Sequence, residues 1–167
     1  MPNVLESFSH NPGLGNEAIS AGYLLPIYSI MAWDYRVRIT HADVPTIPAE
    51  WVLFTTPSFV LQVASERVLV ADIWAIINWE PATYLEYGSQ PLAANYAANN
   101  EFTAVELVWV PNGRYQVTLV GFCDQQNPAV ETRSCGYELL LTRNDQAVFG
   151  LLNSIDDLDL DVVKLPT

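Results

Sequence analysis

The stretch from Thr103 to Phe122, TAVELVWVPNGRYQVTLVGF, constrains the fold of this chain more than any other stretch. On both sides of Pro111-Asn112-Gly113, β-branched and aromatic residues recur at a period of two, which is typical of half-buried strands. Asn112 and Gly113 tolerate positive φ, and the preceding proline fixes the approach to them. The stretch therefore predicts a β-hairpin.

Within this hairpin, Tyr115 is expected to point inward with its hydroxyl bonded to nearby backbone. The alternate positions, Glu106, Arg114 and Gln116, are expected to face water. The order L-x-x-x-P-x-G-x-Y-x-V over residues 107–117 resembles the corner found in many β-sandwiches. That resemblance implies sandwich architecture and says little about activity.

Other segments also have the composition of strands. Phe59–Val63 and Arg67–Val70 flank Ser65-Glu66 and predict a second hairpin. Ile73–Trp79 is apolar on both faces and predicts a central strand, with a buried helix as the alternative. The remaining predicted strands lie within residues 23–40 and at 51–54, 136–142 and 147–152, and a short helix is possible at 92–98.

About ten short strands separated by turns, without an internal repeat, indicate an all-β fold. A length of 167 residues suits one domain, and 50% apolar with 16% charged residues suits a folded globule. We predict a single-domain antiparallel β-sandwich over residues 23–163, with one or two short helices. Residues 1–22 are expected to be an irregular N-terminal segment, with one or two helical turns at 16–21 that Gly22 ends.

The net charge is −12, from 19 acidic and 7 basic residues. Such a surface repels nucleic acid and anionic membranes, whereas it attracts basic proteins and speeds their encounter. The chain starts without a basic n-region or an apolar h-region, and its apolar runs are too short to span a membrane. These features predict a cytoplasmic protein with a basic protein partner, while its oligomeric state is open.

Catalytic motifs are missing from the sequence. The two histidines, His10 and His41, lie in predicted loops outside any HExxH motif, and there is no Gly-x-Ser-x-Gly elbow. We therefore predict no enzyme activity, no cofactor and no metal. An enzyme that pairs His41 and Asp43 with a distant nucleophile remains an alternative.

The two cysteines, Cys123 and Cys135, stand at the end of one predicted strand and the start of the next. If those strands pair, the thiols lie side by side, and a bridge would add about 3 kcal/mol in an oxidising compartment. Because the predicted location is cytoplasmic, we expect two reduced thiols.

Acidic and aliphatic residues alternate near the C-terminus, which predicts a strand with one acidic face. Calcium binding is an alternative, although a hard cation needs oxygens from a loop that curls around it. A basic partner is the interpretation that we develop. The candidate partner-binding residues are Asp156, Asp157, Asp159 and Asp161, with Glu131 and Glu138 near the hairpin.

A second interpretation is a carbohydrate- or small-ligand-binding β-sandwich that uses exposed aromatic residues. A sugar platform needs two or three rings exposed in one plane. Tyr84, Tyr87 and Tyr96 lie in a polar connection and are the candidates for this platform.

Residues 104–142 resemble the C-terminal half of the competence protein J family, which are small acidic bacterial inhibitors of a DNA-degrading nuclease. The matching features are VPNGRYQVT at 110–118, a polar loop, and the closing strand from Tyr137. They cover about a quarter of the chain, and no inhibitory residue can be carried over. The resemblance implies a non-enzymatic acidic protein that inhibits a basic nuclease or toxin, as an immunity protein does.

Overall fold

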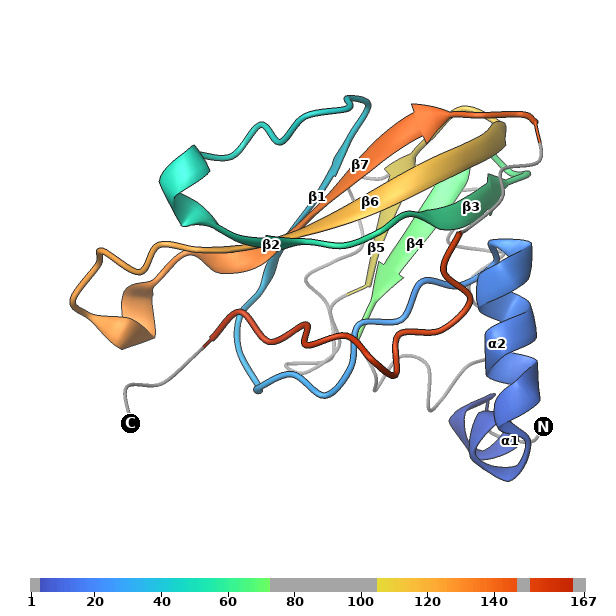
Figure 1. Cartoon of the computed structure of the whole chain (residues 1–167), viewed down its shortest axis with the longest axis horizontal. Coiled ribbons are helices and arrows are strands. Elements are labelled where there is room, and N and C mark those ends of the chain that lie inside the picture. The colour runs from blue at the N-terminus through green and yellow to red at the C-terminus, as the bar shows by residue number, and fades with distance from the viewer. Residues whose placement is uncertain (1–3, 73–104, 147–150, 164–167) are drawn as a thin grey trace. The chain divides into compact units, whose positions relative to one another are not determined.

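The computed structural model describes residues 4–72, 105–146 and 151–163 (Figure 1). This part of the chain is mainly β-structure with two short α-helices, in agreement with the coarse prediction. The chain divides into two compact units, residues 1–16 with 63–112 and residues 17–62 with 113–167. The elements are α1 (Val4–His10), α2 (Pro12–Ala21), β1 (Arg36–Thr40), η1 (Ala49–Trp51), β2 (Val52–Thr55), β3 (Phe59–Val63), β4 (Arg67–Ala71), β5 (Val105–Trp109), β6 (Gly113–Cys123), η2 (Val130–Thr132) and β7 (Cys135–Arg143).

The N-terminal segment is helical over 4–10 and 12–21, so the prediction of an irregular segment is wrong there. Helix α2 begins at Pro12, because proline has the helical φ and lacks an N–H that the first turn leaves unused. The prediction that Gly22 ends this helix is confirmed by its φ of 78°. The amide of Gly22 donates to Ile19, and the amide of Tyr23 donates to Ala18, which caps the last turn.

The larger unit is built on a five-stranded sheet in the order β1-β7-β6-β2, with β3 also pairing with β6. Strands β6 and β7 form an antiparallel hairpin in register from Tyr115↔Arg143 to Cys123↔Cys135. The sheet is mixed rather than purely antiparallel, because β1 runs parallel to β7. A sandwich of two facing sheets stays a prediction, as does the single domain.

Glycine allows β1 to approach β7 closely. Arg36 of β1 lies opposite Gly136 of β7 in the register. A Cβ at Gly136 would overlap the carbonyl oxygen of Arg36, so any other residue would push β1 away. The absence of a side chain at one position therefore permits the parallel pair.

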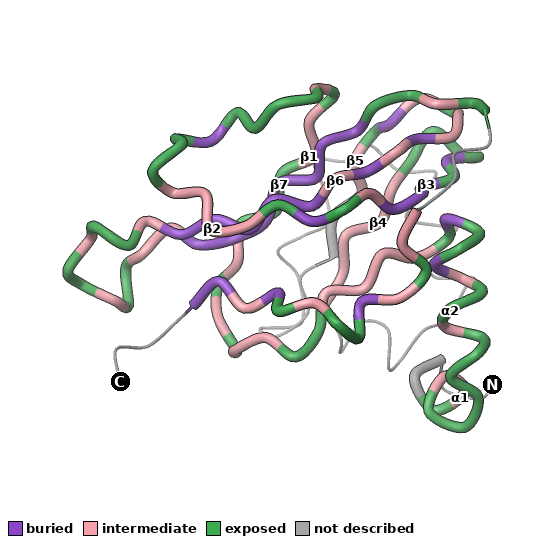
Figure 2. The backbone as a smooth tube through the Cα atoms, in the orientation of Figure 1, coloured by how far each residue is buried: buried purple, intermediate pink, exposed green. Residues whose placement is uncertain are grey.

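One face of this sheet is covered by the segment that follows β1. Val120, Phe122 and Leu140 share a face by the alternation of the strands and pack against the buried Ile47. Trp51 and the start of β2 extend this cluster at its margin. The purple stretches of β6 and β7 in Figure 2 mark this buried centre.

The other face is covered by the segments before β1 and after β7. The rings of Tyr35 and Tyr137 lie 5.4 Å apart between their centroids. A Cβ at Gly121 would overlap the Phe54 ring and crowd Val162, which shows how closely both side chains pack on β6. Irregular segments therefore cover both faces of the sheet in this unit.

The stretch Thr103–Phe122 does not form the predicted hairpin. Its described part makes two strands, but β5 pairs with β4, whereas β6 pairs with β7, β2 and β3. The backbone at 110–112 bonds to the β3–β4 turn instead: Val110 N donates to Glu66 O at 3.1 Å, and Asn112 Oδ1 accepts the Glu66 N–H at 2.7 Å. Residues 110–112 thus connect two sheets.

The second predicted hairpin, at Ser65-Glu66, is also wrong as a pairing, although both of its strands exist. The predicted strand within residues 23–40 is confirmed only over 36–40. Ser29 has a φ of 58°, which is incompatible with an extended strand. The predicted strand at 73–79 and helix at 92–98 lie outside the described residues.

Candidate functional site

The predicted acidic residues at the C-terminal end lie on one extended segment, residues 151–163, called here the acidic segment. It contains no strand, so that prediction is wrong. Its aliphatic residues Ile155, Leu160, Val162 and Val163 are nevertheless buried. The Tyr137 hydroxyl donates to Leu160 O at 2.8 Å and fixes the segment on the sheet.

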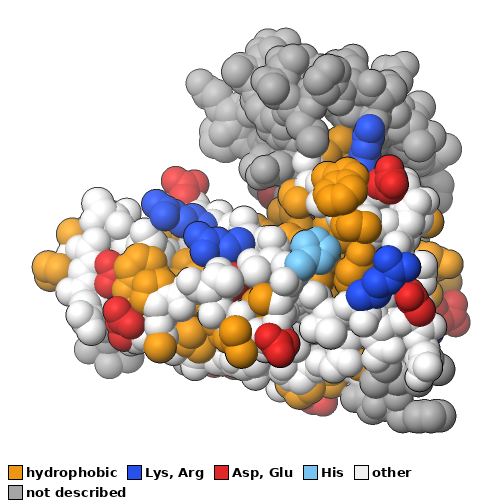
Figure 3. Space-filling view, turned by 90° about the horizontal axis from the view of Figure 1, so that it is seen from above, with side chains coloured by type: hydrophobic (Ala, Val, Ile, Leu, Met, Phe, Trp, Pro, Cys, Tyr) orange, Lys and Arg blue, Asp and Glu red, His pale blue; other side chains and the backbone are white. Residues whose placement is uncertain are grey.

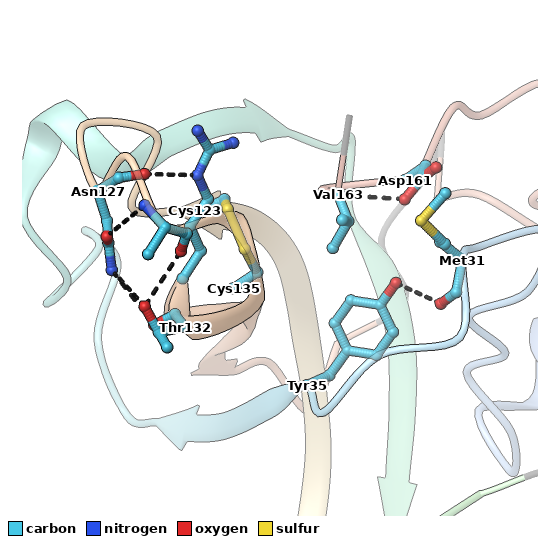
Figure 4. The surroundings of a disulfide bond; sticks show 10 residues. Met31, Tyr35, Cys123, Asn127, Thr132, Cys135, Asp161 and Val163 are labelled. Atoms are coloured by element: carbon cyan, nitrogen blue, oxygen red, sulfur yellow. Dashed lines mark hydrogen bonds between the residues drawn. A yellow bond between two sulfur atoms is a disulfide. The ribbon is translucent and has the colours of Figure 1, made fainter. Parts of the chain in front are cut away.

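Side chains of the acidic segment replace the hydrogen bonds that a strand would have made. Asp159 Oδ1 accepts the Asp161 N–H at 3.2 Å. In turn, Asp161 Oδ1 accepts the Val163 N–H at 3.1 Å (Figure 4). Ser154 Oγ accepts the Asp156 N–H in the same way. Short acidic and hydroxyl side chains commonly compete with sheet formation by such local bonds.

The carboxylates project from this anchored backbone toward solvent. Asp156, Asp157 and Asp159 are exposed, and Asp161 is half-buried. The Tyr28 hydroxyl donates to Asp156, which lowers the pKa of that carboxyl, and the bond from Ser154 lowers the pKa further. The hydrogen bond between Tyr28 and Asp156 also raises the pKa of the Tyr28 hydroxyl. The structure therefore brings all four predicted aspartates together on one segment.

Two phenols lie close to this charge. Burial raises the pKa of Tyr35 to about 12, and the negative charge of Asp161 contributes to the rise. Burial also raises the pKa of Tyr137, with smaller contributions from Tyr35, Asp161 and Asp159. Both phenols stay neutral near pH 7, so the net charge of this region comes from its carboxylates.

Glu138 belongs to the buried sheet and not to the exposed surface. Its side chain is 0% exposed. It accepts hydrogen bonds from Thr40 Oγ1 at 2.7 Å, from Thr46 N at 2.9 Å and from the Thr46 hydroxyl. A buried carboxylate cannot contact a partner, so we remove Glu138 from the partner-binding set.

The pKa of Glu138 follows from this environment. Burial acts to raise the pKa of Glu138, but bonds from the Thr46 and Thr40 hydroxyls and from the amides of Thr46 and Ile47 outweigh it. The net result is a pKa below the ordinary value, and the carboxylate stays charged at neutral pH. Its role is to fasten residues 41–48 to the sheet.

Glu131 is exposed in the loop that joins β6 to β7, away from the acidic segment in sequence. That loop is closed at its base by Cys123 and Cys135, which form a disulfide. The prediction that the strands place the two cysteines side by side is confirmed, and the prediction of reduced thiols is wrong. Disulfides persist mainly in oxidising compartments, which weighs against the predicted cytoplasmic location.

Charge elsewhere is more dispersed. On the face drawn in Figure 3, acidic side chains are separated by uncharged ones, and basic side chains lie among them. By contrast, no Lys or Arg occurs between Arg143 and Lys164 in the sequence. The acidic segment instead carries four aspartates within the six residues 156–161.

Sequence reasoning missed two features of the surface. Tyr28, which was assigned to a strand, is exposed and bonds to Asp156. Trp109, which ends a predicted half-buried strand, is 59% exposed and lies opposite Arg67 in the β4–β5 pair. Neither feature had a signal in the sequence, because strand periodicity does not show which face another part of the chain covers.

Other predicted sites gain no support. Among the described residues, no group of three or more His, Cys, Asp and Glu side chains is arranged to hold a metal ion, so calcium binding by the acidic segment is not pursued. His41 is exposed, and its ring makes an edge-on contact with the buried Tyr115. The sugar-platform residues Tyr84, Tyr87 and Tyr96 lie outside the described residues, and that interpretation stays a prediction.

No helix in the described part of the chain has both the length and the apolar character needed to cross a membrane. The resemblance to the competence protein J family stays a prediction. No family model, curated protein or solved structure matches this chain.

Proposed function

We propose that this chain is an acidic binding protein that neutralises a basic protein, such as a nuclease or a toxin. One observation carries the proposal: the acidic segment buries its aliphatic residues and holds its carboxylates outward at fixed positions. The net charge of −12 is consistent with such a role. A catalytic function has no comparable support in the described residues.

The chemistry of inhibition follows from charge. Basic enzymes that act on nucleic acids use Lys and Arg to hold phosphate groups. Carboxylates presented in a row compete for the same cations, because both anions accept hydrogen bonds from guanidinium and ammonium groups. The acidic segment would then occupy the surface that the nuclease or toxin needs for its own substrate.

The energetics limit what this segment can contribute. An exposed ion pair contributes only about 0.2–1 kcal/mol, and salt screens it. Four such pairs mainly raise the association rate by electrostatic steering rather than supplying tight affinity. We therefore expect the acidic segment to control how fast the partner binds and how strongly binding depends on salt.

The experiment compares two variants with the same change of net charge. In the first, the four aspartates of the acidic segment become asparagine, which keeps an oxygen for the local backbone bonds. In the second, four exposed acids elsewhere are neutralised. These control substitutions are Glu17→Gln, Asp34→Asn, Asp43→Asn and Glu50→Gln.

The immobilised wild-type chain first captures proteins from an extract of the native host, and a bound basic protein is identified by mass spectrometry and purified. At low salt, the acidic-segment variant should associate with that protein about tenfold more slowly, and the control variant much less so. Equal slowing of both variants would refute a specific role for the segment. Failure to bind any basic protein would refute the proposed function.

A further inference from the structure

Strand β1 forms an open edge of the five-stranded sheet. It stands first in the order β1-β7-β6-β2, and among the described strands it pairs only with β7 (Figure 1). Within the described part of the chain, no hydrogen bond joins the outer edge of β1 to another segment. Because alternate residues of an edge strand turn their N–H and C=O groups outward, β1 offers donors and acceptors to an added strand.

The opposite side of the sheet has no comparable edge. Strand β2 has four residues, and its register with β6 shifts between Val52 and Phe54. Strand β3, which also pairs with β6, already donates from Gln62 N to Gly22 O at 2.8 Å. A bulged or occupied edge resists pairing with another chain. By contrast, β1 stays in register with β7 over all five residues, Arg36–Thr40, so it is the edge that can accept a further strand.

The side chains of β1 select the charge of that strand. Arg36 and Arg38 lie on one face by the alternation of the strand, Val37 lies on the other, and all three are exposed. Arg38 donates to Thr46 Oγ1 at 3.1 Å. Within the described residues neither arginine forms an ion pair, although the chain has 19 acidic residues. Two cations on one face of an open edge are complementary to a segment with carboxylates at alternate positions.

A second copy of the chain fits this edge poorly. In an antiparallel pair of two β1 strands centred on Val37, Arg36 of each copy would lie opposite Arg38 of the other. Like charges directly opposite each other are destabilising, so this dimer is disfavoured. The acidic segment of a second copy is held on its own sheet, where the Tyr137 hydroxyl donates to Leu160 O at 2.8 Å. The edge therefore suits a segment of another protein.

We propose that the outer edge of β1 binds an extended acidic segment of another protein, which adds a strand to the sheet. Main-chain hydrogen bonds would hold the segment, and carboxylates opposite Arg36 and Arg38 would set its charge. An apolar residue between those carboxylates would lie on the face of Val37. This surface takes a ligand of the opposite charge to that of the acidic segment's partner, so the proposal does not rest on the proposed function.

Three synthetic peptides of the same length are the probes. The Glu-Val peptide alternates these two residues, and the Gln-Val peptide has the same shape without charge. The Glu-Pro peptide keeps the carboxylates but lacks half of the N–H groups that a ladder needs. The net charge of −12 repels an acidic peptide at long range, so nonspecific electrostatics would favour the Gln-Val peptide. A preference for the Glu-Val peptide would therefore come from local contacts.

The variants remove cations on and off the edge. Arg36→Gln removes one cation and keeps the bond between Arg38 and Thr46. The double variant Arg36→Gln with Arg38→Gln removes both cations of the edge. Its control, Arg67→Gln with Arg143→Gln, removes two exposed cations outside β1 and causes the same change of net charge. Urea unfolding verifies that each variant is folded.

Peptide binding is measured by fluorescence anisotropy at low salt. Wild type should bind the Glu-Val peptide at least about fivefold more tightly than either other peptide, since it alone offers both carboxylates and a ladder. Arg36→Gln should weaken this binding about threefold and the double variant about tenfold, whereas the control should change it by less than about twofold. The bound Glu-Val peptide should also slow hydrogen exchange of amides at 36–40, because an added strand covers them.

Several results would overturn the proposal. Equal affinity for the Glu-Val and Glu-Pro peptides, or unchanged exchange at 36–40, would mean that no strand is added. Equal effects of the double variant and its control would exclude the arginines of β1, and no binding of the Glu-Val peptide at about 1 mM would exclude the site. A wild-type dimer in sedimentation, with its amides at 36–40 already protected, would show that a second copy occupies the edge. The proposed function would stand in each case, because it concerns a basic protein and the acidic segment.

Discussion

Replacing Glu138 tests whether a buried carboxylate fastens residues 41–48 to the sheet. Two substitutions separate its charge from its hydrogen bonds. Glutamine keeps the shape and still offers an oxygen to the Thr46 and Ile47 amides, while its NH₂ group can donate to the hydroxyls of Thr40 and Thr46. Leucine has similar bulk but offers no acceptor to any of these donors.

The magnitudes follow from the bonds. A hydrogen bond to a charged group contributes about 1.5–3 kcal/mol, and a buried donor without an acceptor costs about 1–3 kcal/mol. Glu138 accepts three such bonds from Thr40 and Thr46, and the Ile47 amide adds another. Glu138→Leu should therefore lower the free energy of unfolding by about 4 kcal/mol. Glu138→Gln, which loses only the charge, should lower it by about 1–2 kcal/mol.

Acid supplies a second, independent readout. Because folding lowers the pKa of Glu138, this group stabilises the fold above its ordinary pKa of 4.5. That contribution is lost as the pH falls through the pKa of the folded state. The other charged group in this network is Arg38, whose guanidinium donates to Thr46 Oγ1 at 3.1 Å. The difference in the free energy of unfolding between wild type and Glu138→Gln should thus be largest at pH 7 and should shrink below pH 4.5.

The assay is urea unfolding followed by tryptophan fluorescence at pH 7 and at pH 4. Glu131→Gln serves as the control, since Glu131 is exposed on the same hairpin and its loss should change stability by less than about 0.5 kcal/mol. Stability of the leucine variant within 1 kcal/mol of wild type would refute the role of Glu138 as a fastener. If the difference in the free energy of unfolding between wild type and Glu138→Gln does not vary with pH, the pKa argument is refuted.

Three further predictions concern single contacts. Gly136→Ala should lower the free energy of unfolding by more than about 2 kcal/mol in the same urea assay, because its Cβ would overlap the backbone of β1; a smaller loss would contradict the close approach. Reducing the Cys123–Cys135 disulfide should lower the free energy of unfolding by about 3 kcal/mol, which urea unfolding with and without reductant would measure. A double-serine variant should show no effect of the reductant. Tyr28→Phe should return the pKa of Asp156 toward its ordinary value in an NMR titration of its carboxyl group, and an unchanged pKa would contradict the bond between them.

Strand positions were predictable where the local pattern was strong, and strand pairing was not. The strands after Gly113 and before Arg143 appear where the period of two placed them. The pairing across Pro111-Asn112-Gly113 failed because a turn sequence limits only local geometry. Asn112 bonds to Glu66, which is distant in the sequence, and that bond connects the turn to another strand pair.

The candidate site was predictable in composition but not in conformation. Between residues 155 and 162, three aspartates are exposed and three aliphatic residues are buried, as the alternation predicts, whereas Leu158 and Asp161 are both half-buried. It does not show whether the backbone finds a partner strand. Here Asp159 and Asp161 bond to the backbone two residues further on, so the chain stays extended without joining the sheet.

For Glu138, by contrast, the sequence did not predict whether the side chain is buried or exposed. In sequence it is one polar residue at an alternate strand position, which is typical of a wet face. Its burial depends on Thr40 and Thr46, and Thr46 lies in a loop that periodicity cannot place over the sheet. A carboxylate is retained inside only when several donors converge on it, and only the folded structure shows that convergence.

The disulfide links the order of the loop at residues 124–134 to the compartment of the protein. In a reducing cytoplasm this loop would lose the bond between Cys123 and Cys135, and only side-chain hydrogen bonds around Asn127 would order it. In an oxidising compartment the disulfide also holds the base of the loop closed, and it restrains the unfolded chain as well as the folded one. The stability of the β6–β7 hairpin should therefore depend on the redox state of its surroundings.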